Sequence, residues 1–402
     1  MAQHHQALCD DILINIFRRL SLESVSISKS VSKRWNCLLS APSFRSKYMR
    51  SMNLLLMGDS ENDSTPLSLL GFFQGSTWPE EISDQTAPRA RLSYLPSTEP
   101  FMPLKSRKFM DDPDCFFVGS STSGIILCGR HPSTYFVCSP LADRWVRLPP
   151  PNDKTCGAMN VAVGFSFEEI QDTVSDIVRG RYRVVRANLR SISQIAHDTL
   201  LIETYSSETG VWEESVLRGC IPFLLIPRWP STVLRGIFYW VAYQSTIVAY
   251  DPDASHNRVW LIELPPSTGV QNVVLGESSS DGLLQCGIDD NVGSSLGLKV
   301  LRLQKNLHGY GCTAMVSALE WTVLYAFRYD WRVDQYPRLI AFYPLDPRFL
   351  LIRFGLVIAW FNVAEGFLYT PIVYYGNILS GFEFHLFPFF LPLPWPAALP
   401  RL

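Results

Sequence analysis

Few residues in this sequence carry charge, and neither sign prevails. Aspartate, glutamate, lysine and arginine make up 18% of the 402 residues, where roughly 25% is usual for a globular protein. The 35 basic residues nearly balance the 37 acidic ones, which leaves a formal charge of -2. A chain with this balance lacks the overall positive charge of a polybasic nucleic-acid binder. We therefore expect no nucleic acid as a partner, and electrostatic attraction has to come from local patches.

Paired cysteines and the usual catalytic motifs are also missing from the sequence. The nine cysteines form no C-x-x-C pair, and an odd number without such spacing is typical of free thiols rather than of a disulfide framework or a zinc site. Phosphate-binding loops, G-x-S-x-G elbows and H-E-x-x-H motifs do not occur. The sequence thus predicts no catalytic residue, no metal site and no cofactor, so we expect a protein that is not an enzyme.

No segment has the pattern of a signal peptide or a membrane helix. The N-terminus opens with Met-Ala-Gln-His-His-Gln, where a secretory signal needs a basic start and then an apolar run of about 7–15 residues. Residues 366–382 carry no charged side chain, yet they contain a proline and several glycines among strand-forming tyrosines, isoleucines and valines. A membrane helix needs about 20 apolar residues. We therefore expect buried strands there, no membrane partner, and a location in the cytoplasm, the nucleus or both.

The N-terminal region does contain the pattern of an amphipathic helix. Residues 10–20 place apolar side chains at the spacing of three and four that one face of a helix requires. A second helical stretch is expected over residues 23–40, with a break near residues 28–30, and Pro42 ends it. The apolar positions of the first helix are Ile12, Leu13, Ile16, Phe17 and Leu20.

This helical region is short and basic. Residues 1–50 contain eight lysines and arginines against three aspartates and glutamates, a local charge of +5. About forty residues bury too little surface to be very stable alone. We therefore expect the surface of a partner or of a following domain to complete the core, and an acidic partner would be attracted.

Three runs in this region, residues 8–13, 16–20 and 31–44, together resemble an F-box. Their sequences are LCDDIL, IFRRL and VSKRWNCLLSAPSF. The resemblance implies a three-helix F-box over residues 8–48 that docks on the Skp-type adaptor of a cullin-RING ubiquitin ligase. From the residues alone, the alternative is that their apolar side chains form the core of a small helical domain. The residues implied for adaptor binding are Leu8, Ile12, Leu13, Ile16, Phe17, Leu20, Val31, Trp35 and Leu38.

The rest of the chain is organised differently. Residues 49–112 show little periodicity and many prolines, and we interpret them as a linker that merges into the second domain, with strands expected as at residues 67–73. From residue 113 to residue 402, short hydrophobic runs alternate with turns, which predicts an all-β domain. The clearest of these runs are residues 124–128, 135–138, 182–186, 236–241 and 247–250.

A motif of an aromatic residue or cysteine, a small polar turn and a second aromatic residue recurs in the β region. It occurs at residues 138–145, 205–212 and 250–260 and, in degenerate form, at residues 361–367. Because the gap before the last copy is close to two repeat units, we expect a missed copy within residues 298–327. A period near 50 is typical of kelch-like β-propeller blades, in which the second aromatic residue packs between blades. A β-sandwich is the alternative.

The same region resembles the F-box-associated domain of plant F-box proteins, on residues 120–127, 139–151, 341–347 and 394–400. This resemblance implies a kelch-like β-propeller that recruits a target protein. The contacts with the target are expected on loops at one propeller face. Packing of the candidate aromatic residues between blades is the favoured alternative. The candidate residues are Trp229, Arg328, Tyr329, Trp331 and Arg332.

The sequence therefore predicts a multidomain chain, with a small all-α F-box followed by an all-β domain. The expected function is that of a substrate-recognition subunit of an SCF-type ubiquitin ligase. Its partners would be a Skp-type adaptor, a cullin-RING scaffold bound through that adaptor, and an unknown target protein. The alternative is a non-catalytic β-propeller scaffold or ligand-binding module with a degenerate F-box, since Cys9 stands where the F-box family usually has a proline.

Overall fold

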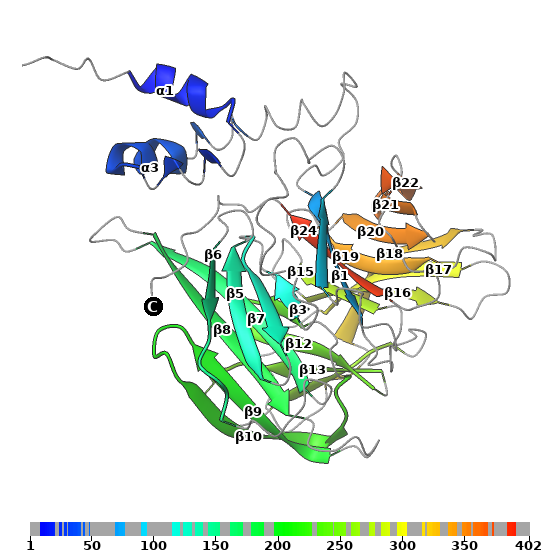
Figure 1. The fold of residues 1–402 in the computed structure, drawn as a ribbon. Helices are drawn as coiled ribbons and strands as arrows, with labels where there is room; N and C mark the ends of the chain where they lie inside the picture. The colour runs from blue at the N-terminus through cyan, green and yellow to red at the C-terminus, as the bar shows by residue number, and fades with distance from the viewer. Residues whose placement is uncertain are drawn as a thin grey trace, which may run out of the picture.

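The computed structural model describes residues 9–20, parts of 24–48, residues 69–76 and 90–94 and, with gaps, residues 115–390 (Figure 1). Helices α1 (Asp10–Phe17) and α3 (Lys33–Ser40) lie in the N-terminal part, and every element described from residue 69 onward is a strand. The expected order of a small helical module followed by an all-β region is therefore confirmed.

The described strands form six antiparallel sheets, which we name A to F. Sheet A combines β2 (Ala90–Tyr94), β1 (Leu69–Ser76) and β24 (Phe384–Phe390), in that order, and the other five sheets follow the chain as meanders. Sheet B consists of β3 (Cys115–Ser120), β4 (Ile126–Arg130), β5 (Thr134–Ser139) and β6 (Arg144–Arg147), and sheet C of β7 (Val161–Gln171), β8 (Val178–Asn188), β9 (His197–Ser206) and β10 (Trp212–Phe223). Sheet D consists of β11 (Thr232–Leu234), β12 (Ile237–Ala242), β13 (Thr246–Tyr250) and β14 (Trp260–Glu263), and sheet E of β15 (Val273–Glu277), β16 (Leu283–Asp289), β17 (Leu296–Leu303) and β18 (Trp321–Tyr329). Sheet F consists of β19 (Arg338–Phe342), β20 (Phe349–Phe354), β21 (Val357–Asn362) and β22 (Phe367–Leu368), and β23 (Ile372–Val373) also pairs with β21.

Neighbouring sheets contact one another through their first strands. β3 contacts β7, β7 contacts β11, β11 contacts β15, and β15 contacts β19. β24 contacts both β19 and β3, so the contacts close into a ring. This is the arrangement of a β-propeller. It excludes the β-sandwich, because six sheets joined in a ring do not form two stacked layers.

Sheet A closes the ring with strands from the two ends of the β region. β1 pairs with β24 from Leu69 opposite Phe390 to Ser76 opposite Phe384, and β2 pairs with the other edge of β1. Two strands therefore lie within the segment that the sequence analysis interpreted as a linker merging into the second domain. No local pattern marks their full pairing, because the partner strand lies near the opposite end of the chain.

The repeated sequence motif occupies the same position in four sheets, the hairpin between the third and fourth strands. Cys138 pairs with Trp145 across β5 and β6, and Tyr205 pairs with Trp212 across β9 and β10. The missed copy expected within residues 298–327 corresponds to the connection between β17 and β18, where Leu303 pairs with Trp321. In sheets D and F the second aromatic residue pairs one position away, with Ala249 and with Asn362. The hairpin position thus repeats in five sheets, although the fifth hairpin starts with a leucine in place of the aromatic residue or cysteine of the motif.

The polar residue that follows the first aromatic residue starts the turn in three of these hairpins. The side chains of Ser206, Asp251 and Asn362 each accept a hydrogen bond from the backbone N–H two residues further on. Such local bonds stabilise a turn without help from the rest of the fold. Gly210 completes its turn with a φ of 71°, a left-handed conformation that favours glycine.

Tryptophans of the motif connect neighbouring sheets. The indole N–H of Trp212 in sheet C donates to the carbonyl oxygen of Pro149, just after sheet B, over 2.8 Å. The indole N–H of Trp321 in sheet E donates to the carbonyl oxygen of Glu263 at the end of sheet D, over 2.9 Å. Both side chains are buried, so these aromatic residues pack between blades as expected.

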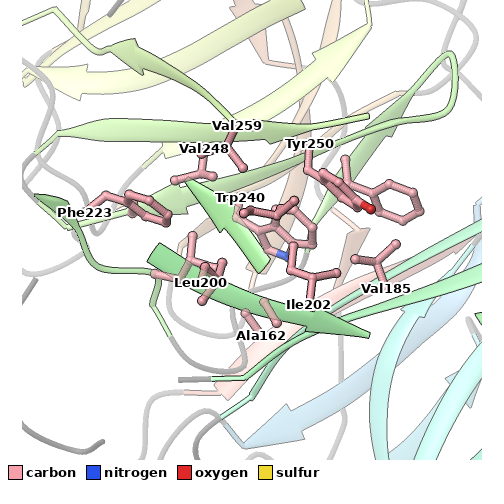
Figure 2. Packing of buried hydrophobic residues seen from close by; sticks show 14 of the residues in the cluster. Ala162, Val185, Leu200, Ile202, Phe223, Trp240, Val248, Tyr250 and Val259 are labelled. Atoms are coloured by element: carbon pink, nitrogen blue, oxygen red, sulfur yellow. The ribbon is translucent and has the colours of Figure 1, made fainter. Parts of the chain in front are cut away.

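Apolar side chains fill the space between successive sheets. Between sheets C and D, Ile202 and Leu200 face Trp240 and Val248 (Figure 2), and all four are buried. The inner strand of sheet C approaches sheet D so closely that a Cβ atom at residue 164 would lie 2.5 Å from the ring of Phe238. Residue 164 is glycine for this reason.

Sheet C also contains a buried ion pair. Arg186 on β8 lies directly opposite Glu203 on β9, and the guanidinium donates a hydrogen bond to the carboxylate. Neither side chain is exposed. Tyr135 of sheet B forms a further hydrogen bond with Arg186. Because breaking a buried pair costs about 3–5 kcal/mol, these charges disfavour any shift in the register of β8 and β9.

Replacing Trp321 by phenylalanine tests the indole hydrogen bond between sheets. Phenylalanine keeps much of the apolar contact but removes the bond to Glu263, so we expect the free energy of unfolding to fall by about 1–2 kcal/mol in urea denaturation of the full chain. Trp145→Phe is the matched control, because Trp145 occupies the same hairpin position in sheet B but is 48% exposed. Equal losses in the two variants would contradict this role of the indole.

Candidate interaction surfaces

The N-terminal helical module is built on a small aromatic cluster. Phe17 packs edge-on against Trp35 with ring centroids 4.9 Å apart, and its other neighbour is Phe44. Tyr48 contacts Phe44 and donates its hydroxyl hydrogen to the carbonyl oxygen of Leu20. Burial of this hydroxyl raises the pKa of Tyr48 above its ordinary value. The cluster links α1 to α3 and to Phe44 and Tyr48 after it, so the described parts of the N-terminal region pack together.

Hydrogen bonds define how the second helical stretch is divided. Ser28 donates its hydroxyl hydrogen to the carbonyl oxygen of Ser24 in a separate helical turn before α3. The side chain of Ser32 then caps α3 by accepting a hydrogen bond from the N–H of Trp35. The break expected near residues 28–30 is therefore present. α1 begins after Cys9, which forms no capping bond with its side chain.

The structure divides the residues implied for adaptor binding into three groups. Leu13 and Phe17 are buried inside the module itself, so their side chains are not available to a partner. Ile12 and Ile16, one turn apart on α1, are 47% and 44% exposed, and Val31 is 60% exposed. Leu20, Trp35 and Leu38 are partly exposed, and Leu8 lies outside the described residues.

The residues suggested for target binding are mostly outside the described part of the chain. Trp229, Trp331 and Arg332 are not among the described residues. Arg328 and Tyr329 form the end of β18, opposite Gly297 and Leu296 of β17. The contact of these five residues with a target therefore stays a prediction.

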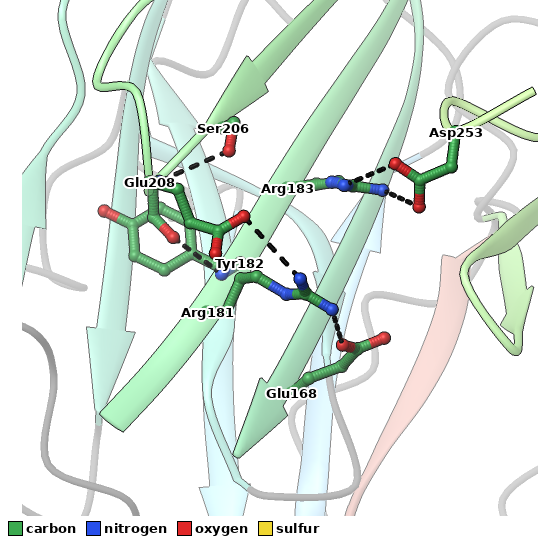
Figure 3. A network of polar contacts seen from close by, with 8 residues as sticks. Glu168, Arg181, Tyr182, Arg183, Ser206, Glu208 and Asp253 are labelled. Carbon is green, nitrogen blue, oxygen red and sulfur yellow. Dashed lines mark hydrogen bonds and ion pairs between the residues drawn. The ribbon is translucent and has the colours of Figure 1, made fainter. Parts of the chain in front are cut away.

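A polar network joins β7, β8 and the turn before β10 of sheet C to the turn after β13 of sheet D (Figure 3). Arg181 contacts Glu168 over 2.6 Å and Glu208 over 3.6 Å. Arg183 donates two hydrogen bonds of 2.7 Å to Asp253, which lies in the turn after β13 of sheet D. These bonds lower the pKa of Asp253 below its ordinary value. No pattern in the sequence predicts this link, because the two residues lie on different sheets.

Two further kinds of site are missing from the described residues. No group of three or more histidine, cysteine, aspartate or glutamate side chains that could hold a metal ion occurs among them. Within the same residues, no helix is both long and apolar enough to cross a membrane.

The fold and the N-terminal module define the class of this protein. Residues 6–47 match the F-box domain, and residues 89–347 match the family described as F-box protein At3g26010-like, beta-propeller. The protein is thus an F-box protein with a β-propeller. Since the second match covers more than half of the chain, the chain belongs to the At3g26010-like F-box β-propeller family.

Individual relatives come from Arabidopsis thaliana. F-box protein At5g03970 is 27% identical over 83% of this chain and 73% of its own length. F-box protein At3g26010 is 25% identical over 64% of this chain and 55% of its own length, and F-box protein At5g07610 is 26% identical over 59% and 52%. The chain therefore spans only about half the length of the last two relatives. F-box domains typically bind Skp1-type adaptors.

Two alanine substitutions separate the core of the F-box from its surface. Phe17→Ala removes the central ring of the aromatic cluster and should cost about 3–5 kcal/mol, so we expect the amides of α1 and α3 to lose protection in hydrogen exchange of the full chain. Ile16→Ala changes an exposed side chain and should stay within about 0.5 kcal/mol. Retained protection in Phe17→Ala would show that the cluster is not the core.

The ion pair between Arg183 and Asp253 predicts a pH dependence. Because the pKa of Asp253 is lowered in the folded state, the pair stabilises the fold above the unfolded pKa, about 3.9, and this contribution is lost as the pH falls through the folded pKa. Asp253 is 67% exposed, so Asp253→Asn should cost less than about 1 kcal/mol at pH 7.

Urea denaturation at neutral and acidic pH measures this contribution. The difference between Asp253→Asn and the unchanged chain should shrink below a pH of about 4. Glu213→Gln is the control, because this exposed carboxylate has no ion pair among the described residues. A pH-independent difference for Asp253→Asn would contradict the electrostatic role.

Proposed function

We propose that this protein is the substrate-recognition subunit of an SCF-type cullin-RING E3 ubiquitin ligase. Its F-box docks on a Skp-type adaptor, which connects it to the cullin-RING scaffold, and its β-propeller recruits a target protein. The observation that supports docking most directly is the exposed apolar pair Ile12 and Ile16 on α1. A small module that leaves such side chains in water on its first helix is suited to a partner that covers them.

The division of the F-box residues gives each group a role in this proposal. Leu13 and Phe17 hold α1 against the rest of the module from inside, and Ile12, Ile16 and Val31 offer the contact surface. The partly exposed Leu20, Trp35 and Leu38 extend it. The local charge of +5 over residues 1–50 would increase the rate of association with an acidic adaptor surface.

The function requires no catalytic residue in this chain. A partner enzyme carries ubiquitin as a thioester, and the F-box protein holds a lysine of the target nearby. This raises the effective concentration of the lysine at the thioester. The protein is therefore proposed to act as a non-catalytic adaptor without a cofactor, in the cytoplasm, the nucleus or both. The kelch-like assignment of the propeller belongs to the same proposal and is supported by the repeated aromatic hairpins.

A second candidate function is that of a propeller scaffold whose F-box no longer binds an adaptor. The observation that favours it is Cys9, which precedes α1 without capping it. The two functions differ in one measurable property, the affinity of the F-box for the adaptor.

Binding of the full chain to a purified Skp1-type adaptor, measured by calorimetry, tests the proposal. We expect Ile16→Asp to weaken binding at least about tenfold, because it places a charge in an apolar contact without changing the core. Tyr243→Asp is the matched control, since Tyr243 is equally exposed, at 44%, but lies in the turn between β12 and β13 of sheet D. This control should bind like the unchanged chain.

The outcomes are distinct. No binding by the unchanged chain would overturn the ligase function and favour the scaffold. Binding that Ile16→Asp leaves intact would show that the exposed face of α1 is not the docking surface.

A further inference from the structure

Exposed large apolar side chains gather in two places among the described residues. Ile12, Ile16 and Val31 lie on the F-box, where the proposed adaptor contact accounts for them. Val211, Val216 and Ile221 lie on β10 or directly before it, and they are 52%, 52% and 42% exposed. Nothing proposed so far accounts for this second group.

β10 is the longest of the described fourth strands. It has 12 residues, whereas β18 has nine, β6 and β14 have four each and β22 has two. Figure 1 shows β9 and β10 as long neighbouring ribbons, with β10 at the edge of its sheet. Edge strands of this length are usually protected by proline, lysine or a covering segment. β10 contains no lysine, and its one proline, Pro222, lies at the end of the strand, outside the stretch from Trp212 to Arg218.

The register shows which backbone groups of β10 point away from β9. The carbonyl oxygen of Arg218 accepts a hydrogen bond from the N–H of Val259, directly before β14 of sheet D, so Arg218 directs its backbone groups away from β9. In an antiparallel ladder, inward and outward residues alternate. Glu214 and Val216 lie four and two residues before Arg218, and the register is uninterrupted between them. Their backbone groups therefore also point outward.

These outward groups form an open edge. Glu214 and Val216 together present two N–H donors and two carbonyl acceptors, and the backbone hydrogen bonds of the described chain outside its ladders include none to either residue. The contact between Val259 and Arg218 marks one end of this edge, and the hairpin turn before Trp212 marks the other.

The charges along the strand indicate what would pair with it. Glu213 and Glu214 are exposed on β10, and Glu208, which is 52% exposed, lies in the preceding turn. Glu203, directly opposite Glu214 across the β9–β10 ladder, is already paired with Arg186. Glu213 and Glu214 outnumber Arg218, the one basic residue of β10. A basic side chain on an added strand would pair with these exposed carboxylates, and apolar side chains beside it would cover Val216.

We propose that β10 binds an extended segment of the target protein as an additional strand of sheet C, and that this segment combines basic with apolar residues. Backbone hydrogen bonds to Glu214 and Val216 give affinity, and the carboxylates of β10 select the charge of the partner. The inference rests on the proposed function, because it takes the bound segment to belong to the target protein.

Selection of a random decapeptide library on the full chain tests this inference. We expect enriched peptides to combine lysine or arginine with β-branched residues. Val216→Pro removes an outward N–H that the β9–β10 ladder does not use, so enriched peptides should bind this variant at least tenfold more weakly. Val216→Thr is the matched control, because it keeps the N–H and should keep the binding. Equal binding to all three chains, or no preference for basic peptides, would overturn the inference.

Two measurements keep the test decisive. In hydrogen exchange with an enriched peptide, the amides of Glu214 and Val216 should become protected, whereas those of Ser215 and Leu217 should not change. Should Val216→Pro fail to fold, the double variant Glu213→Lys and Glu214→Lys replaces it, and its preference should reverse toward acidic peptides. An unchanged preference would overturn the inference.

The adaptor assay and light scattering separate the other outcomes. A chain that binds the peptides but no adaptor would overturn the ligase function, whereas a chain that binds the adaptor and enriches no peptide would overturn the inference. A dimer that Val216→Pro converts to a monomer would show that a second copy of the chain covers β10, and the target segment would then be the wrong occupant.

Discussion

The backbone pairing of β1 with β24 is the constraint on which the rest of the propeller depends. Five sheets follow the chain as simple meanders, but their ring is closed only where β24 reaches both sheet F and sheet B. Without this pairing, the inner edges of both sheets would be exposed, and exposed sheet edges are prone to wrong pairing. β1 is also the first described strand after the F-box, so the sheet that closes the ring is the one to which the F-box is tethered.

The F-box and the propeller both leave some apolar side chains exposed to water. The F-box is too small to bury all its apolar side chains, so α1 covers Leu13 and Phe17 and leaves Ile12 and Ile16 in water. The propeller is large enough for a full core, yet sheet C extends further than the ring requires and leaves Val216 exposed on β10. In both places, exposed apolar surface lies beside charge, which is the composition of a surface that a selective partner covers.

Much of the architecture could be predicted from local sequence. The periodicity of residues 10–20 predicted α1, and the aromatic hairpins predicted the third and fourth strands of four sheets. Their spacing also indicated a further hairpin within residues 298–327, where the structure pairs Leu303 with Trp321. For the residues implied in adaptor binding, the sequence did not distinguish the buried side chains from the exposed ones. Adjacent apolar residues such as Ile12 and Leu13 satisfy the same pattern, and only tertiary packing decides that Leu13 is buried and Ile12 is exposed. The link from Arg183 to Asp253 had no signal in the sequence, because it joins turns and strands of different sheets.

The sequence by itself determined the helical N-terminus, the alternation of short strands with turns, and the F-box resemblance. Each of these depends on contacts within about ten residues of chain, such as a capping serine or a turn that starts at Asn362. Tertiary structure alone decided the closure of the ring through β24, the burial of Arg186 against Glu203, and the open edge of β10. These depend on which distant segments meet, and a chain's local propensities do not specify such meetings.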